Sequence, residues 1–86
     1  MVKNNRDTEV LKKLGNRLKQ VRILKGISQE ELALKIDTTQ KQIWKIEQGL
    51  TDPTFCRLNA IALVFEMDIN ELLQMNNNPD YSEPNQ

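Results

Sequence analysis

Apolar residues recur along this chain at intervals of three and four positions, the spacing of an amphipathic helix. The first stripe ends shortly before Gly26, a residue that tolerates the left-handed backbone at which many helices stop. The stripe consists of Leu11, Leu14, Leu18 and Val21. The sequence therefore predicts a first helix over residues 8–25.

Two short helices are predicted next, because the chain repeats a helix-capping pattern. Ser28 is followed three residues later by Glu31, and Thr39 by Gln42, which is the spacing of a capping box. Gly49 provides the stop for the second of these helices. The predicted core positions of the pair are Leu32, Ala33, Ile36, Ile43 and Ile46. The pattern predicts a helix pair separated by a tight turn at residues 37–39.

Two more helices complete the prediction. Asp52 and Pro53 are typical of an N-cap and a first helical position, and Asp68 is typical of a further N-cap. The predicted core positions here are Phe55, Leu58, Ile61, Ala62, Phe65, Ile69, Leu72 and Leu73. The expected fold is all-α, a compact five-helix domain over residues 8–75. A flexible basic segment (1–7) and a disordered tail rich in Asn and Pro (76–86) would flank it.

The charge is divided unevenly along the chain. Residues 1–45 hold eleven Lys and Arg against five Asp and Glu, whereas residues 46–86 hold one against seven. The net charge of zero hides this division. Contacts of Lys and Arg with phosphate are therefore expected in the first half.

Several kinds of chemistry are not expected. The chain of 86 residues has one cysteine and no histidine, so neither an internal disulfide nor the usual zinc spacings can be written, and no metal or cofactor is expected. Without histidine the usual base that would activate Cys56 is missing, so Cys56 is interpreted as a small core residue and the protein as no enzyme. No membrane-length apolar stretch or signal region is present, which favours the cytoplasm.

The second helix of the predicted pair carries side chains that can read DNA. In such pairs the second helix lies in the major groove with its N-terminal residues at base edges, and these places fall to Gln40 and Lys41. Glutamine can bond adenine bidentately, and lysine can donate to the acceptors of guanine. Trp44 and Lys45 share the outward face one turn later.

Residues 15–73 resemble the phage repressor and Cro family of helix-turn-helix proteins. Four features carry the resemblance: Arg22, the segment Ser28-Gln29-Glu30-Glu31-Leu32-Ala33, the segment Ile43-Trp44-Lys45-Ile46-Glu47-Gln48-Gly49, and the segment Asp68-Ile69-Asn70-Glu71-Leu72-Leu73. Together they are more specific than the helix pair alone.

The resemblance implies roles for individual residues. Gln29 would contact a phosphate and brace the first reading residue, and Arg22 and Glu47 would form an ion pair between the first helix and the end of the reading helix. The resemblance implies Gln40, Lys41 and Lys45 as base-reading residues and Gln29, Thr51 and Phe55 as phosphate contacts. The full set expected from the sequence adds Trp44 to the base-reading residues and Thr39 to the phosphate contacts.

Two positions depart from the family pattern. Trp44 replaces a small or polar residue, so it would stack on sugar, contact a thymine methyl, or fold back over its helix. The loop at residues 50–53 lacks the basic residues of many relatives, and Asp52 would oppose phosphate unless it caps the fourth helix.

The cations outside the helix pair are not expected to read bases. Lys12, Lys13, Arg17 and Lys19 are interpreted as a solvated face of the first helix. Lys3 and Arg6 are placed in the flexible segment, with a minor-groove arm as the alternative.

The function expected is a sequence-specific regulator of transcription, a repressor that binds double-stranded DNA at a palindromic operator as a homodimer. The dimer contact is placed at Met67, Leu73 and Met75, and no small-molecule effector domain is expected. The alternative is a protein-interaction module in which Trp44 anchors a partner, as in an antitoxin that holds its toxin. The charge division favours DNA.

Overall fold

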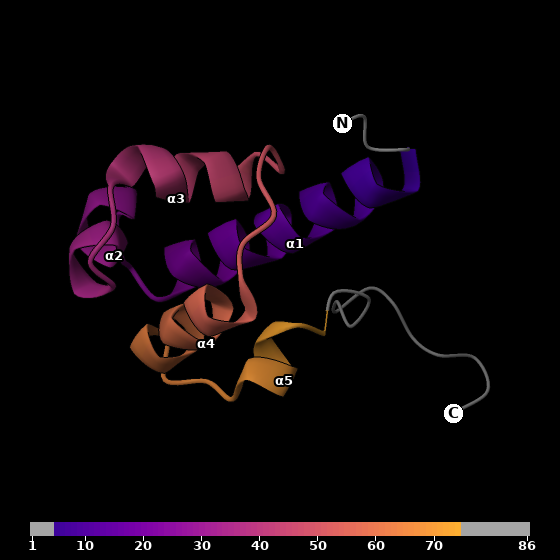
Figure 1. Cartoon of the computed structure of the whole chain (residues 1–86). Coiled ribbons are helices and arrows are strands. Elements are labelled where there is room, and N and C mark those ends of the chain that lie inside the picture. The colour runs from indigo at the N-terminus through magenta and orange to yellow at the C-terminus, as the bar shows by residue number, and fades with distance from the viewer. Residues whose placement is uncertain (1–4, 75–86) are drawn as a thin grey trace, which may run out of the picture.

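The computed structural model describes residues 5–74, which form five α-helices and, within that part of the chain, no strand (Figure 1). The helices are α1 (Asn5–Leu24), α2 (Gln29–Lys35), α3 (Gln40–Glu47), α4 (Phe55–Val64) and α5 (Ile69–Leu72). The predicted all-α class and five helices are confirmed. α1 begins three residues before its predicted start. The predicted tail at 76–86 and residues 1–4 lie outside the described residues.

Polar side chains fix where four of the helices begin. Each accepts a hydrogen bond from a backbone N–H in the first turn, a group that has no partner within the helix. The four bonds are Glu31 N to Ser28 Oγ (2.9 Å), Gln42 N to Thr39 Oγ1 (3.1 Å), Arg57 N to Thr54 Oγ1 (3.1 Å) and Asn70 N to Asp68 Oδ1 (2.7 Å). Three of these caps are the ones that the sequence predicts.

The start of α4 was predicted wrongly. Thr54 caps this helix, so Asp52 and Pro53 lie in the preceding loop and the Asp52 side chain is exposed. Phe55 becomes the first helical residue, beyond the end of the buried stripe, and is 65% exposed, which corrects its predicted place in the core. Cys56, the next residue, is also exposed and is no core residue.

The first four helices end in the same backbone arrangement. The residue after each C-cap is left-handed, and two N–H groups beyond the helix bond back to carbonyls of its last turn, a Schellman motif. Gly26 and Gly49 fill this position after α1 and α3, with φ of 73° and 75°. Asp37 and Glu66 fill it after α2 and α4, both at φ 60°. Side chains other than glycine are strained in this region, Glu more so than Asp.

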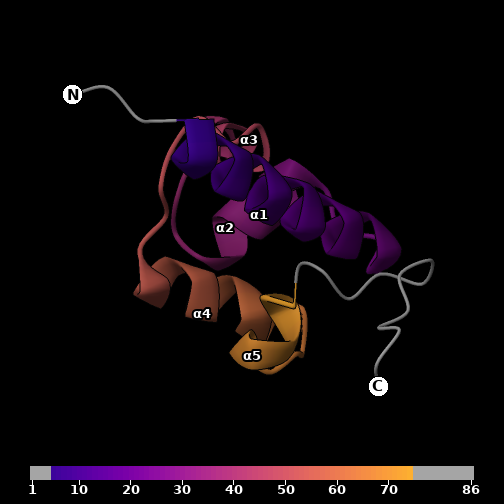
Figure 2. The same cartoon turned by 90° about the vertical axis from the view of Figure 1, so that its right-hand side faces the viewer.

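One apolar cluster joins all five helices. α3 lies on one side of α1, and α4 with α5 on the other (Figures 1 and 2). The buried members are Leu14, Leu18, Val21, Leu32, Ala33, Ile43, Ile46, Leu58, Ile61, Ala62, Phe65 and Leu72. Ile36, Ile69 and Leu73 pack against this cluster while partly exposed, and Leu11 is buried on α1. Apart from Phe55, the predicted core positions are therefore buried or packed on the core.

Arg17 connects the end of α5 to α1. Its Nε donates to the carbonyl of Leu72 and its Nη2 to that of Glu71, both at 2.9 Å. These carbonyls at the C-terminal end of a helix lack helical partners and carry partial negative charge. The interpretation of Arg17 as a solvated cation is therefore wrong, although Lys12, Lys13 and Lys19 are exposed.

The backbones of α1 and the end of α3 approach each other closely. A Cβ built on Gly15 would lie 2.4 Å from the carbonyl oxygen of Ile46 and 2.5 Å from that of Glu47. A Cβ on Gly49 would lie 2.9 Å from Cα of Lys12. Two glycines, one on each side of the contact, therefore make room for it.

Gly15→Ala is expected to destabilise the fold by about 2 kcal/mol or more, because the added methyl meets rigid backbone and α3 has to shift. Gln20→Ala, at an exposed position of the same helix, is the control and should change stability by less than about 0.5 kcal/mol, since Gln and Ala are both good helix formers. Urea unfolding of both variants measures the difference. Equal stability of the two would contradict the close contact.

Glu66→Gly is expected to stabilise the fold by about 1 kcal/mol, because glycine relieves the left-handed strain at φ 60°. Glu66→Ala also removes the carboxylate but keeps a Cβ, so it should give no gain. The melting temperatures of the two variants decide the matter, and a gain shared by Ala and Gly would show that the carboxylate, not the backbone, is responsible.

Candidate nucleic-acid interface

The predicted base-reading residues lie on one face of α3. Successive helical residues are about 100° apart, so positions 40, 41, 44 and 45 occupy one continuous arc of the helix. Ile43 and Ile46 occupy the opposite side and are buried. Gln40, Lys41 and Trp44 are exposed, and Lys45 is half-buried. We call this arc, Gln40, Lys41, Trp44 and Lys45, the reading face.

The reading face combines hydrogen-bonding, cationic and aromatic groups. Within residues 5–74 no side-chain hydrogen bond or ion pair occupies the ammonium groups of Lys41 and Lys45, so both can donate to an external acceptor. Trp44 is 44% exposed and does not fold fully back over the helix. Such a surface can meet phosphate, base edges and a thymine methyl.

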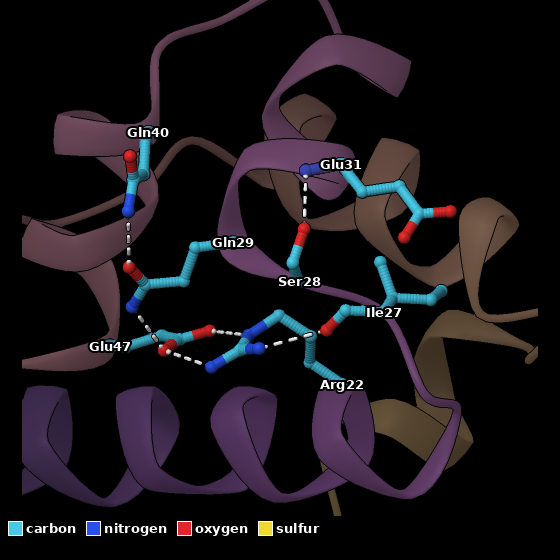
Figure 3. A network of polar contacts seen from close by, with 7 residues as sticks. All are labelled: Arg22, Ile27, Ser28, Gln29, Glu31, Gln40 and Glu47. Carbon is cyan, nitrogen blue, oxygen red and sulfur yellow. Dashed lines mark hydrogen bonds and ion pairs between the residues drawn. The ribbon is translucent and has the colours of Figure 1, made fainter.

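A buried ion pair joins α1 to the last turn of α3. The carboxylate of Glu47 accepts from Arg22 through two bonds, Nε to Oε2 at 2.6 Å and Nη2 to Oε1 at 3.1 Å (Figure 3). The side chains are 10% and 1% exposed for Arg22 and Glu47. The pair implied by the resemblance is therefore present.

Arg22 also holds the start of the helix pair. Its Nη1 donates to the carbonyl oxygen of Ile27 at 2.8 Å, just before the cap of α2. The single guanidinium therefore ties together α1, the entry to α2 and the end of α3. Its planar fork of five donors suits three such bonds at fixed angles.

Two glutamines extend this network to the surface. Gln29 Nε2 donates to Glu47 Oε1 at 2.9 Å, and Gln40 Nε2 donates to Gln29 Oε1 at 3.4 Å. Figure 3 shows the contacts running from the buried pair through Gln29 to Gln40. The bracing of Gln40 by Gln29 fits the role that the resemblance implies. The bond from Gln29 to Glu47 is not among the sequence predictions, because neither the helix pattern nor the roles implied by the resemblance pair these two residues.

The residues implied as phosphate contacts lie at the surface around this network. Thr39 is exposed, and because its oxygen accepts from Gln42 N, the hydroxyl hydrogen is left to donate elsewhere. Gln29 and Thr51 are half-buried and Phe55 is exposed. Asp52 follows Thr51 in the loop between α3 and α4. Its exposed carboxylate adds negative charge there instead of capping α4.

The expected dimer contact and the N-terminal cations are described only in part. Met67 and Leu73, expected at the dimer contact, pack on the core while partly exposed. The third residue of that contact, Met75, lies outside the described residues, as do Lys3 and the side chain of Arg6. Among the residues described, no helix is long and apolar enough to cross a membrane, and no three metal-ligating side chains gather in one place.

Comparison with known proteins agrees with this architecture. Residues 15–78 match the family described as helix-turn-helix domain. No curated protein sequence matches the chain. The solved structure of the restriction-modification controller protein C.AhdI from Aeromonas hydrophila is similar with a TM-score of 0.70 and 29% identity, over 72% of this chain and 94% of that one.

The clp gene regulator ClgR from Corynebacterium glutamicum shares the fold in two solved structures, at TM-scores of 0.73 and 0.74 and 20% identity. Each covers 77% of this chain, which in turn covers 85% and 70% of theirs. The resemblance to the phage repressor and Cro proteins is thereby confirmed. This chain belongs to the helix-turn-helix family of DNA-binding transcription regulators.

Proposed function

We propose that this protein is a sequence-specific, double-stranded DNA-binding repressor that recognises a palindromic operator as a homodimer, in the cytoplasm. The observation that carries the proposal is the reading face of α3, exposed along one arc and fixed to α1 through Glu47. A helix held in this way can enter the major groove without reorganising.

Each residue of the reading face has a task that its chemistry suits. Gln40 would bond adenine through its amide, and Lys41 would donate to the acceptors of guanine. Lys45 follows one turn later and would reach the next base or its phosphate. Trp44, between Gln40 and Lys45 on the helix surface, would contact a thymine methyl or a sugar.

Phosphate contacts around the reading face would fix its position on the duplex. Gln29 and Thr39 stand at the N-terminal ends of α2 and α3, where N–H donors also face outward. Thr51 and Phe55 would place the α3–α4 loop against the next phosphate. Asp52 opposes that contact, which predicts a modest affinity for a single domain.

A dimer would supply the missing affinity and the symmetry of the operator. One domain of this size covers little DNA, and two copies would read half-sites about one helical turn apart. The proposed contact uses Met67, Leu73 and Met75. Occupancy of the operator would then repress transcription. The similarity to a restriction-modification controller protein supports a regulatory role.

A second candidate is a protein-interaction module with Trp44 as its anchor. The exposure of this tryptophan supports it, because Trp is enriched at the centres of protein interfaces. The two lysines beside Trp44, which have no partner within residues 5–74, favour DNA.

Selection from a random duplex pool at near-physiological salt tests the proposal. The wild type should enrich a roughly palindromic site with half-sites about ten base pairs apart, and Gln40→Ala/Lys41→Ala should lose that enrichment. Binding to the enriched site should weaken steeply as salt is raised, because bound phosphates release counterions.

Gln42→Ala is the matched control, since Gln42 is exposed on α3 but outside the reading face. This variant should select the same site as the wild type. Failure of the wild type to enrich any duplex would contradict the proposal and favour a partner that docks on Trp44.

A further inference from the structure

A hydrogen bond to Gln29 fixes the orientation of the Gln40 side-chain amide. An isolated glutamine can turn its amide by half a rotation and exchange the places of Oε1 and Nε2. Here Nε2 is engaged by Gln29 Oε1 at 3.4 Å. One N–H and the oxygen remain for an external partner, in a fixed order.

The direction of that bond is set at the buried end of the network. An ionised carboxylate can only accept hydrogen bonds, and the guanidinium of Arg22 can only donate. Glu47 Oε1 therefore requires Gln29 to present its NH2 group, at 2.9 Å. The Gln29 amide then offers only its oxygen to Gln40, which must answer with its own NH2 group.

The consequence concerns the choice between adenine and guanine. In the major groove adenine offers one acceptor and one donor, whereas guanine offers two acceptors. A glutamine amide held in one orientation matches adenine. An amide that can turn is able to direct its NH2 group at guanine as well.

We propose that Glu47 is a specificity-determining positioning residue: its buried carboxylate, acting through Gln29, fixes the hydrogen-bond polarity of Gln40 and so enforces adenine over guanine. The inference rests on the proposed function, since it assumes that Gln40 faces a base. Glu47 itself touches no DNA in this arrangement, because it is 6% exposed.

Two variants, the polarity variants, release the fixed orientation of the Gln40 amide at different points of the network. Arg22→Met/Glu47→Gln replaces both buried charges with neutral groups, leaves no unpaired ion, and gives position 47 an amide that can accept or donate. Gln29→Met keeps the ion pair and removes the link to Gln40. Gln48→Met is the matched control, because Gln48 is an exposed glutamine beside Glu47 in sequence with no side-chain bond among the described contacts. Thermal unfolding verifies that each variant is folded.

The decisive experiment measures Kd for duplexes in which each base pair of the selected operator is varied singly. The position that Gln40 reads is the one whose preference is lost in Gln40→Ala. There the wild type and Gln48→Met should favour adenine over guanine by about tenfold or more. Both polarity variants should narrow this ratio to about threefold or less and leave preferences at other positions in place.

Loss of affinity by one common factor on all duplexes, with the adenine preference intact, would overturn the inference and leave Gln29 and Glu47 as structural or phosphate-contacting residues only. A wild type without any base preference would refute the proposed function, and the inference with it.

A measurement without DNA separates these two failures. The side-chain NH2 group of Gln40 should be ordered by NMR relaxation in the free wild type and in Gln48→Met, and mobile in Gln29→Met, which removes its hydrogen-bond partner. Equal mobility in the wild type, Gln48→Met and Gln29→Met would overturn the inference, because Gln29 would then place no constraint on Gln40.

Discussion

The buried ion pair between Arg22 and Glu47 joins α1, the entry to α2 and the last turn of α3. Taking two charges out of water costs several kcal/mol each, and their attraction repays this only when the geometry is good and the remaining donors and acceptors are satisfied. Here the carboxylate accepts three bonds, and the guanidinium also holds the carbonyl of Ile27. Within the described residues no buried side-chain nitrogen or oxygen lacks a partner.

The same pair links the fold to the surface that would read DNA. Gly15 lets the end of α3 rest directly on α1, which brings Glu47 to Arg22, and Gln29 carries the constraint outward to Gln40. The apolar core explains why the helices pack, but apolar contacts have no direction. The polar network supplies the direction, because each of its bonds joins a particular donor to a particular acceptor.

Much of this arrangement could be predicted from the sequence, because the signals are local. The apolar stripes, the caps at Ser28 and Thr39 and the glycine stops act within a few residues of where they are read. At the start of α4 two cap-forming residues compete, and Thr54 prevails over Asp52, which moves Phe55 out of the core. The role of Arg17 could not be predicted, because its partners on α5 are more than 50 residues away.

A double-mutant cycle on the free energy of unfolding tests whether the Arg22–Glu47 pair holds α3 on α1. Arg22→Met and Glu47→Leu should each cost about 3 kcal/mol or more, because each leaves a buried charge without its partner. The double variant should recover most of the wild-type stability. Single variants within about 1 kcal/mol of the wild type, with additive effects in the double variant, would show that the pair does not hold α3 on α1.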